Sequence, residues 1–120
     1  MIRRSNEMPF ETVEHFKGGA GRLVMRTIQD ETELKGYGRK FGNSILNPGC
    51  AIGTHTHHGD SEAYYIISGK GRYNDNGTWC EVGPGDLTYC EDGETHGLEC
   101  FGDEPLTFIA LILYTEPKKQ

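Results

Sequence analysis

Long hydrophobic runs are missing from this 120-residue sequence. The longest, from Phe108 to Tyr114, is far shorter than the roughly 20 apolar residues that a membrane-spanning helix needs. The first residues, from Met1 to Glu7, turn polar where the apolar part of a signal peptide would begin. We therefore expect no membrane span and no export signal, and predict a cytoplasmic location.

Basic charge is also scarce, because 12 lysines and arginines stand against 18 acidic residues, giving a formal net charge of -6. Proteins that bind nucleic acid or an anionic membrane surface usually carry a basic patch. We therefore expect neither as a partner. A chain of this length is expected to form one domain around one hydrophobic core.

Closely spaced cysteine pairs are absent as well. None of the four cysteines belongs to the C-x-x-C pattern that marks zinc ribbons and redox motifs. They are Cys50, Cys80, Cys90 and Cys100. In a reducing cytosol we expect free thiols, most of them buried in the core.

Glycine, by contrast, is abundant, and the 17 glycines fall between short apolar runs. This punctuation is typical of short strands joined by tight turns. It predicts an all-β fold, an antiparallel sandwich or barrel, with its clearest hairpin at Asp75-Asn76-Gly77. Only residues 9–17 and 30–34 could hold short helices. The predicted strands are residues 23–28, 39–46, 53–57, 63–67, 71–74, 78–82, 86–90, 96–100 and 106–113.

The most informative segment is HTHHGDSE, residues 55–62. Side chains alternate between the two faces of a strand, so His55 and His57 are expected on one face. Glu62 opens the next predicted strand, and His96 lies on a later one. Three imidazoles and one carboxylate can therefore meet in space.

Such a set of ligands suits one divalent transition metal, such as Mn, Fe, Co, Ni or Zn. Four protein ligands in an octahedral shell leave two positions for water or substrate, which is the arrangement that metal catalysis needs. The competing interpretation is a polar pocket that binds its ligand, or transfers protons, without a metal.

The spacing of these residues resembles the two sequence motifs of the cupin family. The first motif is matched at every defined position, by Gly49, His55, His57, Glu62 and Gly69. The second motif is matched by Gly85, Gly93 and His96. Two positions depart from it, with Glu91 in place of proline and Cys100 in place of asparagine. The short gap between the motifs, residues 70–84, is that of compact single-domain members.

The resemblance implies a double-stranded β-helix, the cupin jelly-roll barrel, as a single domain over residues 1–120. The barrel core is expected at about 36–114, after an N-terminal extension, 1–35. The resemblance also implies a homodimer, and the strand at 23–28 has room to add to a neighbour's sheet. One divalent metal ion per chain would be bound by His55, His57, Glu62 and His96.

Residues around the motifs receive weaker assignments. Tyr64 shares the face of Glu62 and is a candidate catalytic residue, although an aromatic ring that fills the barrel is an equal expectation. We expect His58 in solvent and Tyr65 facing outward. Cys100 should face the interior, either as packing or as a soft polar group near the substrate. Arginines that could clamp a carboxylate substrate, if they are not simply surface charge, are Arg26, Arg39 and Arg72.

The predicted function is that of a mononuclear metal-dependent cupin enzyme with a small polar substrate, either a carboxylate or a sugar-derived compound. Iron or manganese would favour dioxygenase or decarboxylase chemistry, and nickel, zinc or cobalt would favour isomerase or lyase chemistry. Glu62 and Tyr64 are the candidate catalytic residues. The alternative is a non-catalytic cupin that binds or senses a metal or a small molecule.

Overall fold

The computed structural model describes residues 1–118 of the chain. Within them, two three-residue 3-10 helices, η1 (Ser5–Glu7) and η2 (Phe16–Gly18), accompany ten strands. The strands are β1 (Glu11–Glu14), β2 (Arg22–Gln29), β3 (Gly38–Leu46), β4 (Ala51–Thr56), β5 (Asp60–Ser68), β6 (Gly71–Asp75), β7 (Thr78–Val82), β8 (Leu87–Cys90), β9 (Thr95–Cys100) and β10 (Leu106–Tyr114). Each of the predicted strands has a counterpart among β2 to β10.

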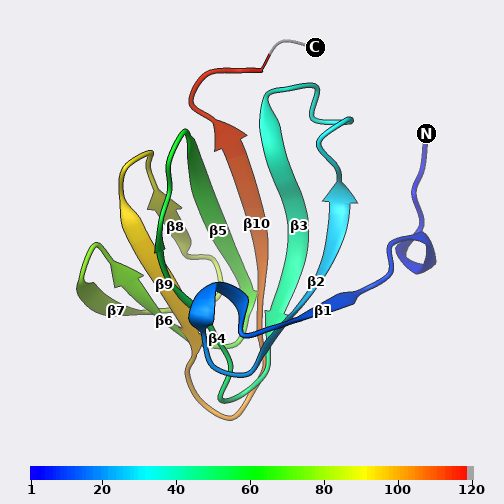
Figure 1. Cartoon of the computed structure of the whole chain (residues 1–120). Coiled ribbons are helices and arrows are strands. Elements are labelled where there is room, and N and C mark those ends of the chain that lie inside the picture. The colour runs from blue at the N-terminus through cyan, green and yellow to red at the C-terminus, as the bar shows by residue number, and fades with distance from the viewer. Residues whose placement is uncertain (119–120) are drawn as a thin grey trace.

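Two antiparallel sheets face each other across the molecule (Figure 1). The larger sheet has the order β1-β2-β3-β10-β5-β8, and the smaller has the order β4-β9-β6-β7. Strands far apart in the sequence, such as β3 and β10, are hydrogen-bonded neighbours. This is the jelly-roll arrangement of a double-stranded β-helix. The predicted all-β fold is therefore confirmed.

The hairpin between β6 and β7 turns at Asn76 and Gly77, whose φ angles are both positive, at 51° and 100°. Two consecutive residues of this kind are typical of a turn whose twist matches that of the flanking strands. The side-chain oxygen of Asn74 also accepts a hydrogen bond of 2.7 Å from the Gly77 N–H. The hairpin predicted at this position is confirmed.

The core lies between the sheets, where every second residue of β10 is buried over most of its length. These inward residues are Leu106, Phe108, Ala110 and Ile112. The smaller sheet faces them with Ile52, Tyr73 and Leu98. Apolar surface removed from water in this way supplies the main driving force for folding.

The buried face of strand β5 is charged at its start and largely apolar further along. Its inward residues are Asp60 and Glu62 near the start, followed by Tyr64 and Ile66. The period of two puts all four on one face of the sheet. One end of the space between the sheets is therefore apolar, while the other holds charged side chains that are shielded from water.

Neither of the two segments that could hold a short helix forms an α-helix. Residues 9–17 instead contain β1 and the start of η2, because β1 pairs with β2 in a tight antiparallel ribbon. Residues 30–34 form turns in which Asp30 accepts hydrogen bonds from the N–H groups of Glu33 and Leu34. Lys35 and Gly36 then adopt positive φ, which ends any helical path after one turn.

Strand β2 does not offer the open edge that was expected of residues 23–28. On one side it pairs with β3, and on the other β1 covers it from Arg22 to Met25. The outermost strand on this side of the sheet is therefore β1. Within residues 1–118, no helix is long and apolar enough to cross a membrane.

Candidate metal centre

Four side chains from three strand regions converge at the polar end of the interior. His55 lies on β4, His57 directly after it, Glu62 on β5 and His96 on β9. Their potential ligand atoms all lie within 4.8 Å of one another. His55 and His96 are directly opposite each other in the β4–β9 ladder. The structure therefore brings together the four residues predicted as metal ligands.

The shortest separations involve the Nε2 atoms of two histidines. His57 Nε2 lies 3.1 Å from His96 Nε2, and Glu62 Oε1 lies 3.2 Å and 3.3 Å from these two nitrogens. His57, Glu62 and His96 are almost completely buried. Polar atoms withdrawn from water at this spacing need a bound proton or cation to satisfy them.

Partners at the Nδ1 atoms orient two of the rings. His55 Nδ1 donates to the Gly53 carbonyl at 2.7 Å, and His57 Nδ1 donates to the Asp60 carboxylate at 2.6 Å. With Nδ1 protonated, Nε2 presents its lone pair to a metal ion. Groups that accept a hydrogen bond from Nδ1 usually orient the histidine ligands of a metal site in this way. His96 Nδ1 lies 2.8 Å from the Tyr73 hydroxyl, which can accept from it in the same way.

Two bare imidazole nitrogens 3.1 Å apart repel each other, so a proton or a metal ion must lie among these atoms. A proton on His57 is one solution, because the hydrogen bond to Glu62 raises the pKa of His57 against the opposing effect of burial. A divalent metal is the other, since three nitrogens and one carboxylate oxygen form a suitable donor set. The residues present therefore fit a metal ion.

The charge states match such a site. Burial opposes ionisation of Glu62, yet in the metal-free protein hydrogen bonds from Nε2 of His57 and His96, when protonated there, and the charge of Lys40 lower its pKa to about 2. Burial lowers the pKa of His55, which favours its neutral form. A carboxylate that is ionised and an imidazole that is neutral are the forms that bind metal.

Asp60 and Arg39 form a supporting pair behind His57. Arg39 donates to Asp60 Oδ2 at 2.8 Å while the other oxygen of Asp60 accepts from His57. Burial opposes ionisation of Asp60, but the bonds from Arg39 and His57 outweigh it and lower its pKa. The pair therefore fixes the orientation of the His57 ring.

Tyr64 lies beneath the cluster, where its ring stacks on that of His96 at 5.0 Å between centroids. Burial and the nearby Glu62 carboxylate raise the pKa of Tyr64 well above its ordinary value, so its phenol stays neutral. Its neighbours include Tyr73 and Phe108 of the core. This geometry favours the core-filling interpretation, and a catalytic role for Tyr64 stays a prediction.

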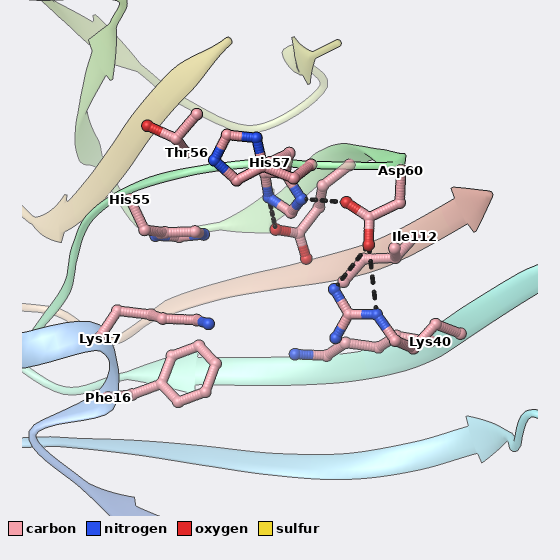
Figure 2. Close-up of a pocket in the computed structure, with 11 residues that line it drawn as sticks. Phe16, Lys17, Lys40, His55, Thr56, His57, Asp60 and Ile112 are labelled. Carbon is pink, nitrogen blue, oxygen red and sulfur yellow. Dashed lines mark hydrogen bonds and ion pairs between the residues drawn. The ribbon is translucent and has the colours of Figure 1, made fainter. Parts of the chain in front are cut away.

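A cavity of about 330 Å³ opens above the cluster. Figure 2 shows His55 and His57 on one wall, with Phe16, Lys17 and Lys40 across the cavity from them. Its lining residues are Phe16, Lys17, Arg39, Lys40, His55, Thr56, His57, His58, Asp60, Glu62 and Ile112. A cavity of this size accommodates a small molecule.

Several of these residues escaped prediction. Phe16 and Lys17 come from the N-terminal segment, to which the sequence motifs do not extend. Lys40 is one basic residue among several on a strand whose inward face was not assigned. Asp60 stands within the histidine segment itself, and its spacing to His57 was the available signal.

The other assignments have mixed outcomes. His58 and Tyr65 are exposed, as expected. Of the candidate arginine clamps, Arg39 lines the cavity, whereas Arg26 lies over Phe10 and Arg72 over Trp79.

Cys100 belongs to the opposite, apolar end of the interior. It is half-buried, packs against the core and donates from its thiol to the Glu104 carbonyl at 3.1 Å. The packing role is therefore favoured over contact with a substrate.

Comparison with known proteins places the chain in a family. The family model described as "Cupin domain" matches residues 43–112, and the chain belongs to the cupin family.

Within it, the chain is 34% identical over 113 residues to the oxalate-binding protein of Thermotoga maritima, covering 94% of this chain and 93% of that one. A solved structure of a predicted oxalate decarboxylase from Thermotoga maritima is 33% identical, with a TM-score of 0.91, over 95% of this chain and 99% of that one. A putative sugar phosphate isomerase from Acidithiobacillus ferrooxidans, 22% identical over 93% of this chain and 74% of that one, shares the fold with a TM-score of 0.78.

Proposed function

We propose that this cupin is a metal-dependent protein that binds a small carboxylate, with oxalate as the first candidate. The observation that carries the proposal is a His3Glu donor set, three of whose members are buried, beside a cavity whose opposite wall carries Lys17 and Lys40. The name of the oxalate-binding relative from Thermotoga maritima supports the choice of ligand.

One divalent ion, Mn, Fe, Co, Ni or Zn, would be held by His55, His57, Glu62 and His96. When bound, such an ion supplies Lewis acidity toward the oxygens of a carboxylate. The protein's own part is to orient these ligands, through the bond of Asp60 to His57 and that of Gly53 to His55. The buried setting strengthens every electrostatic interaction made there.

The lining of the cavity favours an anion over a sugar. Lys17 and Lys40 carry positive charge into it, and Arg39 adds a third cation that is already paired with Asp60. A sugar site needs several neutral hydrogen-bonding side chains, and among the lining residues within 1–118 Thr56 is the one hydroxyl. We therefore place a carboxylate ahead of a sugar-derived compound.

Turnover is the second part of the proposal, as a lyase or oxidoreductase of the decarboxylase or dioxygenase kind. Cleavage of the carbon–carbon bond of oxalate would release carbon dioxide and leave formate once the cleaved carbon takes up a proton. Lys40 lines the cavity, and burial lowers its pKa, which eases proton donation from its ammonium. Glu62 would act as a metal ligand in this scheme.

Binding without turnover remains the alternative, and one observation favours it. The carboxylates in the cavity are both engaged, Glu62 with His57 and His96 and Asp60 with Arg39 and His57. Neither is a free general base.

The test is calorimetric titration of oxalate into protein loaded with Mn²⁺, followed by assay for formate and carbon dioxide. Saturable binding that is lost in His57→Ala supports the proposal, and product formation selects the enzyme over the binding protein. Absence of oxalate binding by protein with a full complement of metal would contradict it.

A further inference from the structure

The segment from His15 to Gly19, which contains η2, forms one side of the cavity. His15 and Lys17 adopt positive φ, at 48° and 56°, a conformation that non-glycine residues rarely take. Three hydrogen bonds within the loop hold it, from Gly18 N–H to His15, from Gly19 N–H to Phe16 and from His15 Nδ1 to Gly19. Backbone strain of this kind persists only where surrounding contacts enforce it, and it is most frequent at functional sites.

The loop is anchored against β4 by two glycines. A side-chain carbon at Gly53 would collide with the Lys17 carbonyl, and one at Gly19 would collide with the backbone of Ala51. The Ala51 N–H also donates to the Ala20 carbonyl at 2.9 Å. Lys17 is thus fixed relative to the strand that carries His55.

Phe16 provides a common support for two lysines. Lys17 Nζ lies 5.6 Å and Lys40 Nζ lies 5.5 Å from the centre of the Phe16 ring. Figure 2 shows the two side chains reaching toward each other from opposite sides, over Phe16 and across from His55. An ammonium near an aromatic face is held there by the ring's quadrupole.

In the part of the chain that the structure describes, neither of these two ammonium groups forms an ion pair with an acidic side chain. Within residues 1–118, the ion pairs involving cavity residues are those of Asp60 with Arg39 and His57 and of Glu62 with His57 and His96. A divalent ion bound at the histidines would carry two positive charges, of which Glu62 neutralises one. The loaded cavity therefore carries a surplus of positive charge on two opposite walls.

We propose that Lys17 and Lys40, positioned by Phe16, form an anion subsite that binds a second acidic group of the ligand, so that the site selects dianions over monoanions. This inference rests on the proposed function, because it assumes that a first carboxylate binds at the metal. Phe16 and Lys17 of the N-terminal segment would then determine specificity from outside both cupin motifs.

The experiment compares oxalate with glycolate, a monoanion of similar size, by calorimetric titration into Mn²⁺-loaded protein. The variants are Lys17→Met, Lys40→Met and the double variant, with Lys70→Met as a matched control on an exposed loop away from the cavity. Metal content is measured for each variant, so that loss of the metal is separated from loss of the subsite.

We expect each cavity substitution to weaken oxalate binding about tenfold and glycolate binding by less than about threefold, the size of one charge-assisted contact. Lys70→Met should match the wild type. Phe16→Leu should reduce the preference for oxalate, and Phe16→Tyr, which keeps the ring, should retain it.

Equal losses for the two ligands, or no change in either, would overturn the subsite while leaving the proposed function intact. If the wild-type protein binds neither ligand, the proposed function is overturned, and the subsite with it.

Discussion

The two ends of the space between the sheets are built by the same strands but differ in chemistry. At one end β5 and β9 contribute Ile66 and Leu98 to the apolar core, and at the other they contribute Glu62 and His96. Burial of the apolar end stabilises the fold. Burial of the polar end removes hydration, which only hydrogen-bonding or charged partners can replace. The apolar core therefore stabilises a site that would not be stable alone.

The largest expected effect follows from breaking the apolar end. Phe108 is fully buried and packs edge-on against Tyr64. Phe108→Ala should lower the free energy of unfolding by about 3–5 kcal/mol, because it removes apolar contacts and leaves a cavity. Urea denaturation measures this change.

Phe101→Ala serves as the control, because Phe101 is an exposed phenylalanine whose loss should cost no more than about 0.5 kcal/mol. Equal costs at the two positions would mean that Phe108 does not belong to the core.

A metal ion should stabilise the polar end in a pH-dependent way. At a free metal concentration about a hundredfold above Kd, the free energy of unfolding should rise by about 2.7 kcal/mol. His57 has a raised pKa, so its bound proton stabilises the fold at low pH, and this contribution is lost as pH rises through that pKa.

Metal and proton compete for His57, so the stabilisation by metal should grow between about pH 5.5 and about pH 8. Glu62 does not limit binding in this range, because its pKa of about 2 keeps it ionised. Thermal melts with and without Mn²⁺ across this range provide the measurement. Stabilisation that is independent of pH would argue that the histidines are not the ligands.

The inner and outer faces of the larger sheet also differ. On the outer face, Tyr65, Ile67, Leu87 and Tyr89 are large apolar side chains with between 47% and 65% of their surface exposed. Contiguous exposed apolar residues mark association surfaces. We propose that this face forms the interface of a homodimer.

Leu87→Glu should therefore convert a dimer into a monomer in sedimentation at micromolar concentration. Tyr37→Glu, at an exposed apolar residue of a distant loop, should leave the dimer unchanged. A wild-type protein that sediments as a monomer would refute the interface.

The smallest effect is expected at Cys100, at the apolar end. Its thiol makes one hydrogen bond to a carbonyl, which a hydroxyl can also make. Cys100→Ser should leave metal content unchanged and cost less than about 1 kcal/mol of stability. Rapid labelling of Cys100 by a bulky thiol reagent in the folded protein would show that the half-buried environment described for it is wrong.

Much of this architecture could be predicted from the sequence. The strand positions follow from glycine-punctuated apolar runs, and the period of two predicts that His55 and His57 share a face. Glu62 meets them because β4 and β5 lie in the two facing sheets. The hairpin at Asn76 and Gly77 follows from residues that accept positive φ.

The cavity's other wall could not be predicted in the same way. His15 and Lys17 take positive φ although neither is glycine, so their conformation depends on the loop's packing against Gly53. The local sequence up to Lys17 allowed a short helix as well. The pairing of β1 with β2, which replaces that helix, is likewise set by tertiary contacts.

The central claim is that one divalent ion binds at the polar end, and metal stoichiometry tests it most directly. Elemental analysis of protein dialysed against Mn²⁺ should give one ion per chain for the wild type. The His55→Ala/His96→Ala variant, which retains the apolar core, should give none. Full occupancy in this double variant would contradict the account, because the ion would then lie elsewhere.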